Sequence, residues 1–592
     1  MLTTLAAPAF AGTWYIEDGD ITISAGESGN NVTQNNETTY GDTGTIITNS
    51  DKDKASSHTV TIEAENEDDK VEVTLKDVNI DASRGSEAAV SVTGKGDTTI
   101  ELDGDNELKS GAGHAGLEHN KTDTSGELTI QDKDNNGSLE AAGGFKGAGI
   151  GSAGSNDAQV KITGGNITAT SDDWGAGIGS GSYGTGTVEI TGGEINATGG
   201  YLGAGIGGGC NGSGNVTISG GTITAAGSDG AAGIGGGYYN GATVTITGNA
   251  VIKNASSTKY GAGIGGGNGS DGNVTISGNA KIENATGGYG AAGIGGGAFS
   301  SPDKIGNGNV VIKDNAKIDN VQGGAYGAGI GGGIYGLSNV TIEGNTKVNA
   351  TGGAGGAAIG GGAGAENNSD NNGNQITIKS NENGSPTINA VGGGTDEGEK
   401  IVIGGAGIGA GCESDADADI TLEGKVTITA TAGKDNVAIG ANGIEQEFSG
   451  LAEGSSITRY DPEGNDITLP TDPVPAVPSS SGGSSADASV QESVFPGLVV
   501  TDKDGQRISY TSIRDNNVLS LRVGRFTASL RASLATLRQL RAEGIDTITF
   551  QTILCSTTLS VDELLAMGGE DTEVVLTHHI RSSTLTVGGK AV

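Results

Sequence analysis

The sequence contains few of the residues on which globular proteins of this length usually depend. Aromatic residues make up 4% of its 592 positions, and there are three cysteines, nine prolines and five histidines. So few aromatics exclude a conventional globular core. An odd number of cysteines implies no disulfide framework. The scarcity of proline, with glycines that follow no three-residue period, excludes collagen. No run approaches the roughly 20 apolar residues of a membrane span, so we expect no membrane insertion.

Positive charge is also scarce. The chain has 33 lysines and arginines against 71 aspartates and glutamates, a formal net charge of −38. Binding to nucleic acid needs clustered basic residues, so a nucleic-acid partner is excluded. An anionic membrane surface is disfavoured for the same reason. Carboxylates on the surface instead favour divalent cations, of which Ca²⁺ is the one cofactor the sequence indicates.

Glycine is abundant, at 112 residues, and it marks an internal repeat. The motif GAGIGGG or a close variant recurs at intervals of mostly 28 to 31 residues, with one interval of 36 and one of 49. Between copies lies a second pattern, such as GNVTISGGTITAAGS after Ile206. The isoleucines of the successive motifs are Ile150, Ile178, Ile206, Ile234, Ile264, Ile294, Ile330, Ile359, Ile408 and, in a weaker copy, Ile439.

Each repeat therefore carries three short β-type runs, punctuated by Gly and Asn turns. A unit of this size is typical of one coil of a parallel β-helix, in which every strand pairs with its copy in the next coil, about 4.8 Å away. We predict an all-β fold: a single-stranded, right-handed parallel β-helix with coils of about 28–30 residues, followed by a small C-terminal α+β domain. The long intervals indicate loop insertions, mainly at 299–308 and 363–375, on a corner where insertions often mark a binding edge.

Changes in composition predict the domain boundaries. Residues 1–12 resemble the end of a secretory signal peptide, although an Ala-rich start without such meaning remains the alternative. The β-helix is expected over 13–450, with looser coils at 13–140 and the GAGIGGG repeats at 141–450. A Pro/Ser/Gly linker follows at 451–492. The α+β domain is expected over 493–592, with a helix at 527–543, a strand at about 545–552 and a short helix that begins at Ser560.

Aromatic residues lie four or five positions before or after the motif isoleucines, on both sides of the Gly-rich segment. Stacked coils align them into two columns beside a flat floor poor in side chains. Such a groove suits an extended sugar polymer, because aromatic faces pack against the apolar faces of sugars. The alternative is that the rings stack on one another for stability. The candidate glycan-binding residues are Phe145, Trp174, Tyr183, Tyr201, Tyr238, Tyr239, Tyr260, Tyr289, Phe299, Tyr326 and Tyr335.

Acidic residues supply candidate calcium ligands. The alternating residues Asp415, Asp417 and Asp419 share one side of a strand, and Glu366 and Asp370 lie in an insertion that is expected to fold nearby. Their hard carboxylate oxygens are ligands that Ca²⁺ prefers, although a solvated acidic face is the other interpretation. The segment 132–137 also resembles the first half of an EF-hand loop, but Gly143 replaces the glutamate that such a loop needs at its last position.

Catalytic groups are sparse. None of the histidines lies in the well-formed repeats, and Asp172-Asp173 beside Trp174 is the one candidate acid/base pair, with an irregular turn as the alternative. Cys210 and Cys412 occupy the same repeat position about six coils apart, which is too far for a disulfide. The sequence therefore favours a protein without catalysis.

The repeat GAGIGGG…NVTISGG…ITATGG resembles secreted and surface right-handed β-helix proteins of Firmicutes that are described as carbohydrate-binding, and more distantly the pectate-lyase-like superfamily. The resemblance covers about residues 13–450. It implies a secreted or cell-surface protein whose partner is a polysaccharide or cell-surface glycan. The NTD, DD, GHG and RIK segments of the pectin-hydrolysing branch are not present in that order, and only Asp172-Asp173 matches. The alternatives are a stalk or adhesin that displays the C-terminal domain, and a polysaccharide lyase or glycoside hydrolase.

Overall fold

The structure is a computed structural model that describes residues 11–298, 301, 304–366, 373–394, 403–473, 498–502, 507–508, 510–515, 517–523, 527–552, 555–569, 572–579 and 582–591. The chain forms two compact units, a long solenoid and a smaller C-terminal domain, and each is described by itself. Candidate residues Phe299 and Asp370 and the first ten residues lie outside the described part. Among the described helices, none is long and apolar enough to cross a membrane.

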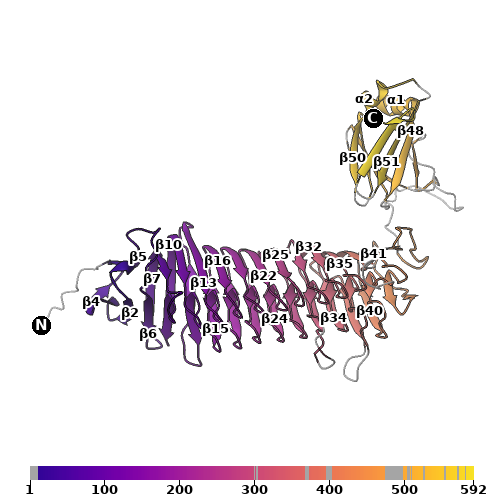
Figure 1. Ribbon diagram of the computed structural model, residues 1–592. Helices are drawn as coiled ribbons and strands as arrows, with labels where there is room; N and C mark the ends of the chain where they lie inside the picture. Colours follow the sequence, from indigo (N-terminus) through magenta and orange to yellow (C-terminus); the bar gives the residue numbers. More distant parts are fainter. Residues whose placement is uncertain are drawn as a thin grey trace. The chain divides into compact units, whose positions relative to one another are not determined.

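The solenoid confirms the predicted parallel β-helix (Figure 1). Each coil contributes one strand to each of three faces, here called A, B and C, and each strand pairs in parallel with the strand one coil away. Repeat positions match in these pairs, so that Ile206 pairs with Ile234 on face A and Val216 with Val244 on face B. The repeat interval of the sequence is therefore the coil length of the structure.

Face A begins with an antiparallel hairpin region and continues with short strands that contain the motif isoleucines. Its strands are β2 (Ile21–Gly26), β3 (Gly29–Gln34), β4 (Glu37–Asp42), β6 (Val60–Ala64), β9 (Val90–Gly94), β11 (Leu117–Lys121), β14 (Ile150–Gly151), β17 (Ile178–Gly179), β20 (Ile206–Gly207), β23 (Ile234–Gly235), β26 (Ile264–Gly265), β30 (Ile294–Gly295), β33 (Ile330–Gly331), β36 (Ile359–Gly360), β39 (Ile408–Gly409), β42 (Ile439–Ala441) and β43 (Ile444–Glu445).

Face B carries the "VTI" runs, and β10 extends across both face B and face C. The strands of face B are β1 (Thr13–Tyr15), which is followed by the 3-10 helix η1 (Ile16–Asp18), β5 (Thr45–Thr48), β7 (Lys70–Lys76), β10 (Asp97–Lys109), β12 (Leu128–Gln131), β15 (Asp157–Ile162), β18 (Gly186–Ile190), β21 (Gly214–Ile218), β24 (Ala242–Ile246), β27 (Gly272–Ile276), β31 (Gly308–Ile312), β34 (Ser338–Glu343), β37 (Asn374–Lys379) and β40 (Ala418–Glu423).

Face C carries the "ITA" runs. Besides the second half of β10, its strands are β8 (Asn79–Asp81), β13 (Gly137–Gly143), β16 (Asn166–Ser171), β19 (Glu194–Thr198), β22 (Thr222–Gly227), β25 (Val251–Ser257), β28 (Lys281–Ile282), β29 (Ala285–Thr286), β32 (Lys317–Gln322), β35 (Lys347–Thr351), β38 (Thr387–Val391), β41 (Thr427–Thr431) and β44 (Ser456–Tyr460).

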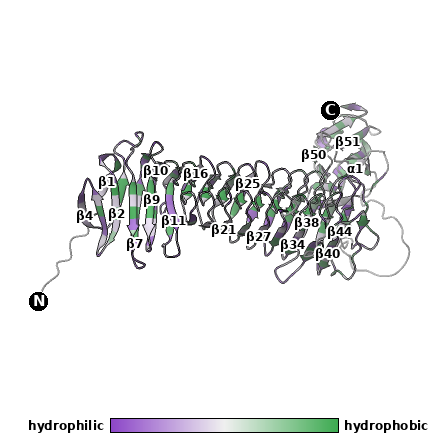
Figure 2. Cartoon of the chain, turned by 60° about the horizontal axis from the view of Figure 1, so that its bottom comes forward, coloured by the Kyte–Doolittle hydropathy of each residue, from purple (hydrophilic) through white to green (hydrophobic). Residues whose placement is uncertain are grey.

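The core of the solenoid is a continuous stack of Ile, Val and Ala from all three faces. Along face B the two apolar residues of each "VTI" run are buried and the Thr between them is exposed or half-buried, as in β24. This alternation, visible as green segments along the strands in Figure 2, follows from the two-residue period of a strand. Aromatic side chains contribute almost nothing to this core, which explains why the chain contains so few.

The GAGIGGG segment folds as a narrow hairpin that points its isoleucine into the core. In the coil of Ile206, the N–H of Ala204 donates to the carbonyl of Gly208 across the hairpin at 3.0 Å. Residues 203–210 are all buried. Gly207 has a φ of +130°, and a side chain there would overlap the carbonyl oxygen of Gly235 in the next coil. The glycines are therefore required for close approach between neighbouring coils.

The solenoid extends beyond residue 450, where the sequence predicted a linker. Strand β44 pairs with β41 as a further strand of face C. The boundary predicted at 451 is therefore wrong, because the chain adds this strand and then folds back over the end of the solenoid. Arg459, fully buried, holds this end together: its Nε and Nη2 donate to the two oxygens of Asp472 at 2.7 and 2.9 Å. Its Nη1 also pairs with Glu445, at 2.5 Å from Oε2.

In its described residues, the C-terminal domain contains two β-sheets and two short helices. One sheet has the order β45 (Val499–Thr501), β48 (Ala528–Ser533), β51 (Glu573–His579), β52 (Ser582–Val587) and β53 (Lys590–Ala591). The other has β46 (Thr511–Asp515), β47 (Val518–Arg522), β49 (Thr547–Gln551) and β50 (Ser556–Ser560), and the helices are α1 (Leu534–Ala542) and α2 (Val561–Leu565). The predicted helix at 527–543 is therefore half wrong, because residues 528–533 form a strand. The helix start at Ser560 is confirmed, since its side chain caps α2.

Candidate functional site: an aromatic ridge and a polar groove

The structure brings the predicted aromatic residues together on one corner of the solenoid, which we call the aromatic ridge. Each of seven successive coils, from the coil of Ile150 to that of Ile330, carries at least one of them. At about 4.8 Å per coil, the ridge is about 29 Å long. Its described members are Phe145, Trp174, Tyr183, Tyr201, Tyr238, Tyr239, Tyr260, Tyr289, Tyr326 and Tyr335, each half-buried or exposed.

The two flanks of the motif form one ridge, and the flat floor expected between them is absent from these coils. Because the motif is a hairpin, its two ends meet. The carbonyl of Trp174 accepts a hydrogen bond from the N–H of Cys210 in the next coil at 2.7 Å, and the carbonyl of Tyr326 accepts from Ala363 at 2.8 Å. The intervening glycines are buried. A ligand therefore meets a line of rings rather than a flat glycine surface.

Some ridge rings contact one another. Tyr289 lies between Tyr260 and Tyr326, with ring centroids 6.3 and 5.5 Å away in edge-to-face geometry. Phe145 and Trp174 form a tilted pair at 5.3 Å. These separations are those of favourable aromatic pairs. Part of the ridge is therefore a ring stack, as the structural interpretation of the sequence expected.

Several ridge residues hold a strained backbone, and among them Trp174, Tyr239 and Tyr326 also make ring contacts. Trp174, Tyr183, Tyr239, Tyr326 and Tyr335 all have φ between +62° and +73°. This left-handed conformation costs a residue with a side chain about 1–2 kcal/mol. At the equivalent positions some coils have Gly, with Gly230, Gly269, Gly290, Gly355 and Gly364 at φ between +66° and +115°, and others have a residue with a side chain, with Lys146, Ser155, Leu202, Asn211 and Glu413 at φ between +50° and +72°. The aromatic residues therefore stand where glycine is the more stable choice.

Tyr183 shows this contrast most clearly. Its φ is +67° and its side chain is 57% exposed. Among the described aromatic residues, none forms a ring contact with Tyr183. Its ring therefore gains little from packing, while its backbone carries the strain of the turn.

Positive charge gathers on the ridge although the protein is acidic. Lys146 Nζ lies 5.3 Å from the ring centroids of both Phe145 and Trp174. Lys304 Nζ lies 4.1 Å above the ring of Tyr239. These are cation–π distances. Lys146 and Lys304 thus supply positive charge along the described ridge.

One ridge carboxyl is chemically distinct. Burial and the adjacent Asp172 raise the pKa of Asp173. Its Oδ1 is buried and has no hydrogen-bond partner within the described structure. Among the described residues, the raised pKa and the unpartnered oxygen of Asp173 are the only observations that favour Asp172 and Asp173 as an acid/base pair.

The predicted calcium ligands do not form a metal centre in the described structure. Asp415, Asp417 and Asp419 are exposed and alternate along one side of β40 and the segment before it, as predicted. Glu366 is also exposed. However, they do not bring three ligand atoms within 4.8 Å of one another, whereas Glu101, Asp132 and Asp134 do.

The cluster of Glu101, Asp132 and Asp134 has its own internal partners. Both oxygens of Asp132 accept main-chain hydrogen bonds, from Asn136 at 3.2 Å and Gly137 at 3.0 Å. Lys133 Nζ lies 3.5 Å from Glu101 Oε2, where it opposes a second cation. The turn at 132–137 is therefore a hydrogen-bonded loop between strands, and the EF-hand interpretation is wrong.

A polar groove lies on face B, at the N-terminal ends of β31, β34, β37 and β40, and has a volume of about 670 Å³. Four of its lining residues, Asn309, Asn339, Gln375 and Asp419, are register partners on successive strands. Sequence reasoning missed this groove. No local signal marked it: a polar residue directly precedes the "VTI" run in each of these repeats (NVVI, NVTI, QITI and DITL), but also in repeats outside the groove, as at Asn215 and Asn273.

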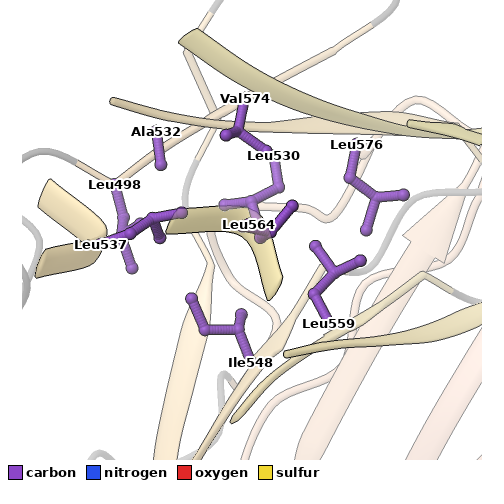
Figure 3. Close-up of a pocket in the computed structure, with 9 residues that line it drawn as sticks. All are labelled: Leu498, Leu530, Ala532, Leu537, Ile548, Leu559, Leu564, Val574 and Leu576. Atoms are coloured by element: carbon purple, nitrogen blue, oxygen red, sulfur yellow. The ribbon is translucent and has the colours of Figure 1, made fainter. Parts of the chain in front are cut away.

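The remaining buried titratable groups have structural roles. Glu118 is buried and accepts hydrogen bonds from Ala115 N, His114 Nδ1 and Asn120 Nδ2 at 2.8–3.0 Å. Burial raises the pKa of Cys210 and of Cys412 to about 11, so both thiols are protonated and unreactive. In the C-terminal domain, the small void of about 10 Å³ in Figure 3 is lined by core side chains such as Leu537 of α1 and Leu564 of α2. This void belongs to the hydrophobic core of the C-terminal domain and is not a ligand site.

The comparison with known proteins agrees with this fold. The family model described as "Beta helix repeat" matches residues 160–182, 188–210, 216–238 and 274–298. Together with the parallel solenoid, these matches show that the chain is a β-helix repeat protein. No curated protein and no solved structure matches it.

Proposed function

We propose that this protein is an extracellular polysaccharide-binding protein without catalytic activity, and that the aromatic ridge is its binding surface. The observation that supports this most directly is the placement of exposed aromatic residues in left-handed turns where glycine costs less. Where no ring contact offsets this strain, as at Tyr183, the residue is expected to contribute something other than stability. Stacking against sugar rings is the interaction that exposed Tyr and Trp faces provide.

The mechanism is multivalent. One coil offers one or two rings, and each stacking contact contributes about 0.5–1.5 kcal/mol. Because the coils hold the rings in a fixed line, binding of one sugar unit brings the next within reach, and affinity increases with the number of units engaged. Lys146 and Lys304 add positive charge on the same line, so an acidic sugar is tolerated there without bridging calcium.

Catalysis is not part of the proposal. Glycoside hydrolysis uses two carboxyl groups with opposed pKa values, and the described ridge offers one such group, Asp173, with a raised pKa. Incubation with pectin and with neutral glucans, followed by a reducing-sugar assay and an absorbance assay for unsaturated products, tests this. Release of reducing sugar would indicate a hydrolase and release of unsaturated products a lyase, and either result would contradict the proposal of binding without catalysis.

The binding proposal is tested with the full chain on insoluble and arrayed glycans, with calcium and with a chelator. We expect Tyr183→Gly to weaken retention about two- to tenfold, the loss of one aromatic contact, while the folded protein becomes more stable. Tyr40→Ala is the matched control, because Tyr40 is 75% exposed and lies in β4, outside the ridge. Unchanged retention of Tyr183→Gly, or no retention of the wild type, would favour a stalk or adhesin that displays the C-terminal domain.

A further inference from the structure

Lys304 contacts the aromatic ridge in a coil other than its own. It lies in the insertion that follows Ile294, whereas Tyr239, whose ring centroid is 4.1 Å from Lys304 Nζ, belongs to the coil of Ile234. These coils are two intervals apart, about 10 Å along the solenoid. A turn sets the position of the lysine, because its N–H donates to the carbonyl of Ser301 at 2.8 Å. The insertion therefore places a cation on a part of the ridge that its own coil does not reach.

The ring of Tyr239 is covered on both faces. Tyr238 lies on one face, with ring centroids 3.8 Å apart and an angle of 36° between the ring planes. Lys304 Nζ lies over the other face, because a ring and an ammonium group this close to Tyr239 cannot occupy the same face. A sugar therefore cannot stack on this ring, although the side chain is 36% exposed. What Tyr239 and Lys304 offer a ligand is polar contact.

The polar groups at this point are hydrogen-bond donors. The hydroxyl of Tyr238 donates to the hydroxyl of Tyr239 at 2.7 Å. Burial and the hydrogen bond with Tyr239 raise the pKa of Tyr238 to about 12, so this donor stays protonated at neutral pH. Within the described residues, the hydroxyl hydrogen of Tyr239 has no acceptor and the ammonium group of Lys304 has no carboxylate partner. An O–H and an ammonium group on one ring are suitable donors to a carboxylate or a sulfate group.

A second lysine, at the start of the ridge, is placed in a similar way. Lys146 Nζ lies 5.3 Å from the ring centroids of Phe145 and Trp174, and it forms no ion pair in the part of the chain that the structure describes. Its φ of +72° is a conformation in which glycine is more stable. By contrast, Lys259 beside the ridge is neutralised by Asp229 at 2.6 Å. Lys146 and Lys304 therefore offer a ligand positive charge that the protein itself does not neutralise.

We infer that the ridge binds an anionic glycan, and that Lys304 and the hydroxyl of Tyr239 hold a carboxylate or sulfate group of this polymer. The inference rests on the proposed function and names the chemical class of its ligand. Lys146 lies two to three coils before Tyr239, about 10–14 Å along the ridge, so it binds a second anionic group of the same chain. Stacking on exposed rings between the two lysines, such as Tyr183, adds to these ionic contacts.

The test compares three hexamers that share one backbone, by calorimetry with the full chain. Cellohexaose is neutral, the corresponding hexamer of glucuronic acid carries carboxylates, and sulfated cellohexaose carries sulfate esters. We expect the wild type to bind at least one anionic hexamer about threefold or more tightly than cellohexaose, with calcium and with a chelator alike. The anionic hexamer that binds more tightly identifies the substituent.

The variant Lys304→Met keeps the apolar stem and removes the charge. We expect it to weaken binding of the preferred anionic hexamer about three- to tenfold, and to leave cellohexaose binding and the melting temperature unchanged. Tyr239→Phe, which removes one hydroxyl, is expected to weaken the same binding about threefold. Lys347→Met is the matched control for net charge, because Lys347 is exposed, lies in β35 on face C and forms no ion pair with the described residues.

The possible failures are distinguishable. If cellohexaose binds as tightly as both anionic hexamers and loses affinity in Tyr183→Gly, the inference is overturned and the proposed function stands. If Lys347→Met weakens anionic binding as much as Lys304→Met does, the effect comes from overall charge and the site is overturned. If no hexamer binds to the wild type, the proposed function fails together with the inference.

Discussion

The buried arginine at the end of the solenoid gives the sharpest test of the physical reasoning. Arg459 is fully buried, and the side chain of Asp472 is fully buried beside it. Besides its two carboxylate partners, the guanidinium donates to the carbonyl of Gln446 at 2.7 Å and of Ile439 at 3.3 Å. Burial lowers the pKa of Arg459, but Asp472 and Glu445 more than compensate and raise it overall. These partners compensate for the loss of hydration that burial of the charged guanidinium entails.

The perturbation is Arg459→Met, which keeps the apolar stem and removes the charge and the donors. It leaves the buried Asp472 without its cation, and breaking one partner of a buried ion pair costs about 3–5 kcal/mol. Because solenoid coils contact only their neighbours, this loss concentrates in the last coil. The equilibrium constant for opening of β42 and β44 is therefore expected to increase by a factor of about 10² to 4 × 10³.

Hydrogen exchange followed by mass spectrometry measures this opening, with mid-solenoid peptides around β21 as the internal reference. Lys52→Met is the control, because Lys52 and its partner Asp105 are exposed, and exposed ion pairs contribute little to stability. The double variant Arg459→Met/Asp472→Leu is expected to recover most of the stability, since it leaves no uncompensated charge. The reasoning is refuted if Arg459→Met changes exchange in β44 no more than Lys52→Met changes it in its own coil.

Three further outcomes follow from the same structure. Gly207→Ala is expected to lower the free energy of unfolding, measured with denaturant, by about 3 kcal/mol, because the added methyl group overlaps the next coil and the φ of this residue is positive. Gly394→Ala is the control and is expected to have no effect, because no atom lies within 4 Å of the added methyl group. Equal effects of the two variants would contradict this reasoning. Burial and the neighbouring His579 lower the pKa of His578, so the unfolded C-terminal domain binds more protons. The protection factors of β51 amides, which are corrected for the intrinsic exchange rate, should therefore decrease as pH falls below about 6.5, and protection factors independent of pH would be inconsistent with this. Because the pKa of Asp173 is raised in the folded protein, the stability of the solenoid decreases as pH rises through that pKa. Asp173→Asn removes the charge and should therefore stabilise the solenoid at neutral pH. A lower melting temperature of this variant would refute the prediction.

The sequence periodicity predicted the solenoid well, because the Ile and Val residues that form the repeat pattern are also the residues that pack in the core. A one-residue slip between coils would turn every buried Val and Ile of face B outward, so the register is strongly specified. Ile178 and Ile206, which are 28 residues apart in the sequence, are therefore register partners on β17 and β20. The insertions inside the longer intervals did not disturb this, since Ile359 still pairs with Ile408.

The shape of the aromatic surface could not be predicted in the same way. Positions four residues before and after the motif isoleucine are about 26 Å apart in an extended strand, which is why two separate columns were expected. In the structure, the hairpin brings the carbonyl of Trp174 to 2.7 Å from the N–H of Cys210 in the next coil. Glycine permits both the extended and the hairpin conformation, so composition alone does not distinguish them.

The two boundary errors have separate physical causes. In the C-terminal domain, Leu530 continues the apolar stripe of the helix, yet residues 528–533 pair with β45 and β51, and Ser533 caps α1 only after them. Strand pairing with distant segments outweighed the local pattern. At the end of the solenoid, Arg459 and Asp472 are 13 residues apart in a segment whose composition resembles a linker, and nothing local indicates their contact.

The position of strain along the solenoid connects stability with the proposed function. A solenoid made only for rigidity is expected to place glycine at every left-handed corner, as the coils of Ile264 and Ile359 do at Gly269 and Gly364. The ridge departs from this rule with aromatic residues at five such corners, in the coils of Ile178, Ile234 and Ile330. Its seven coils of rings span about 29 Å. A surface of that length engages an extended polymer better than a compact ligand, because only a polymer meets the same contact once per coil.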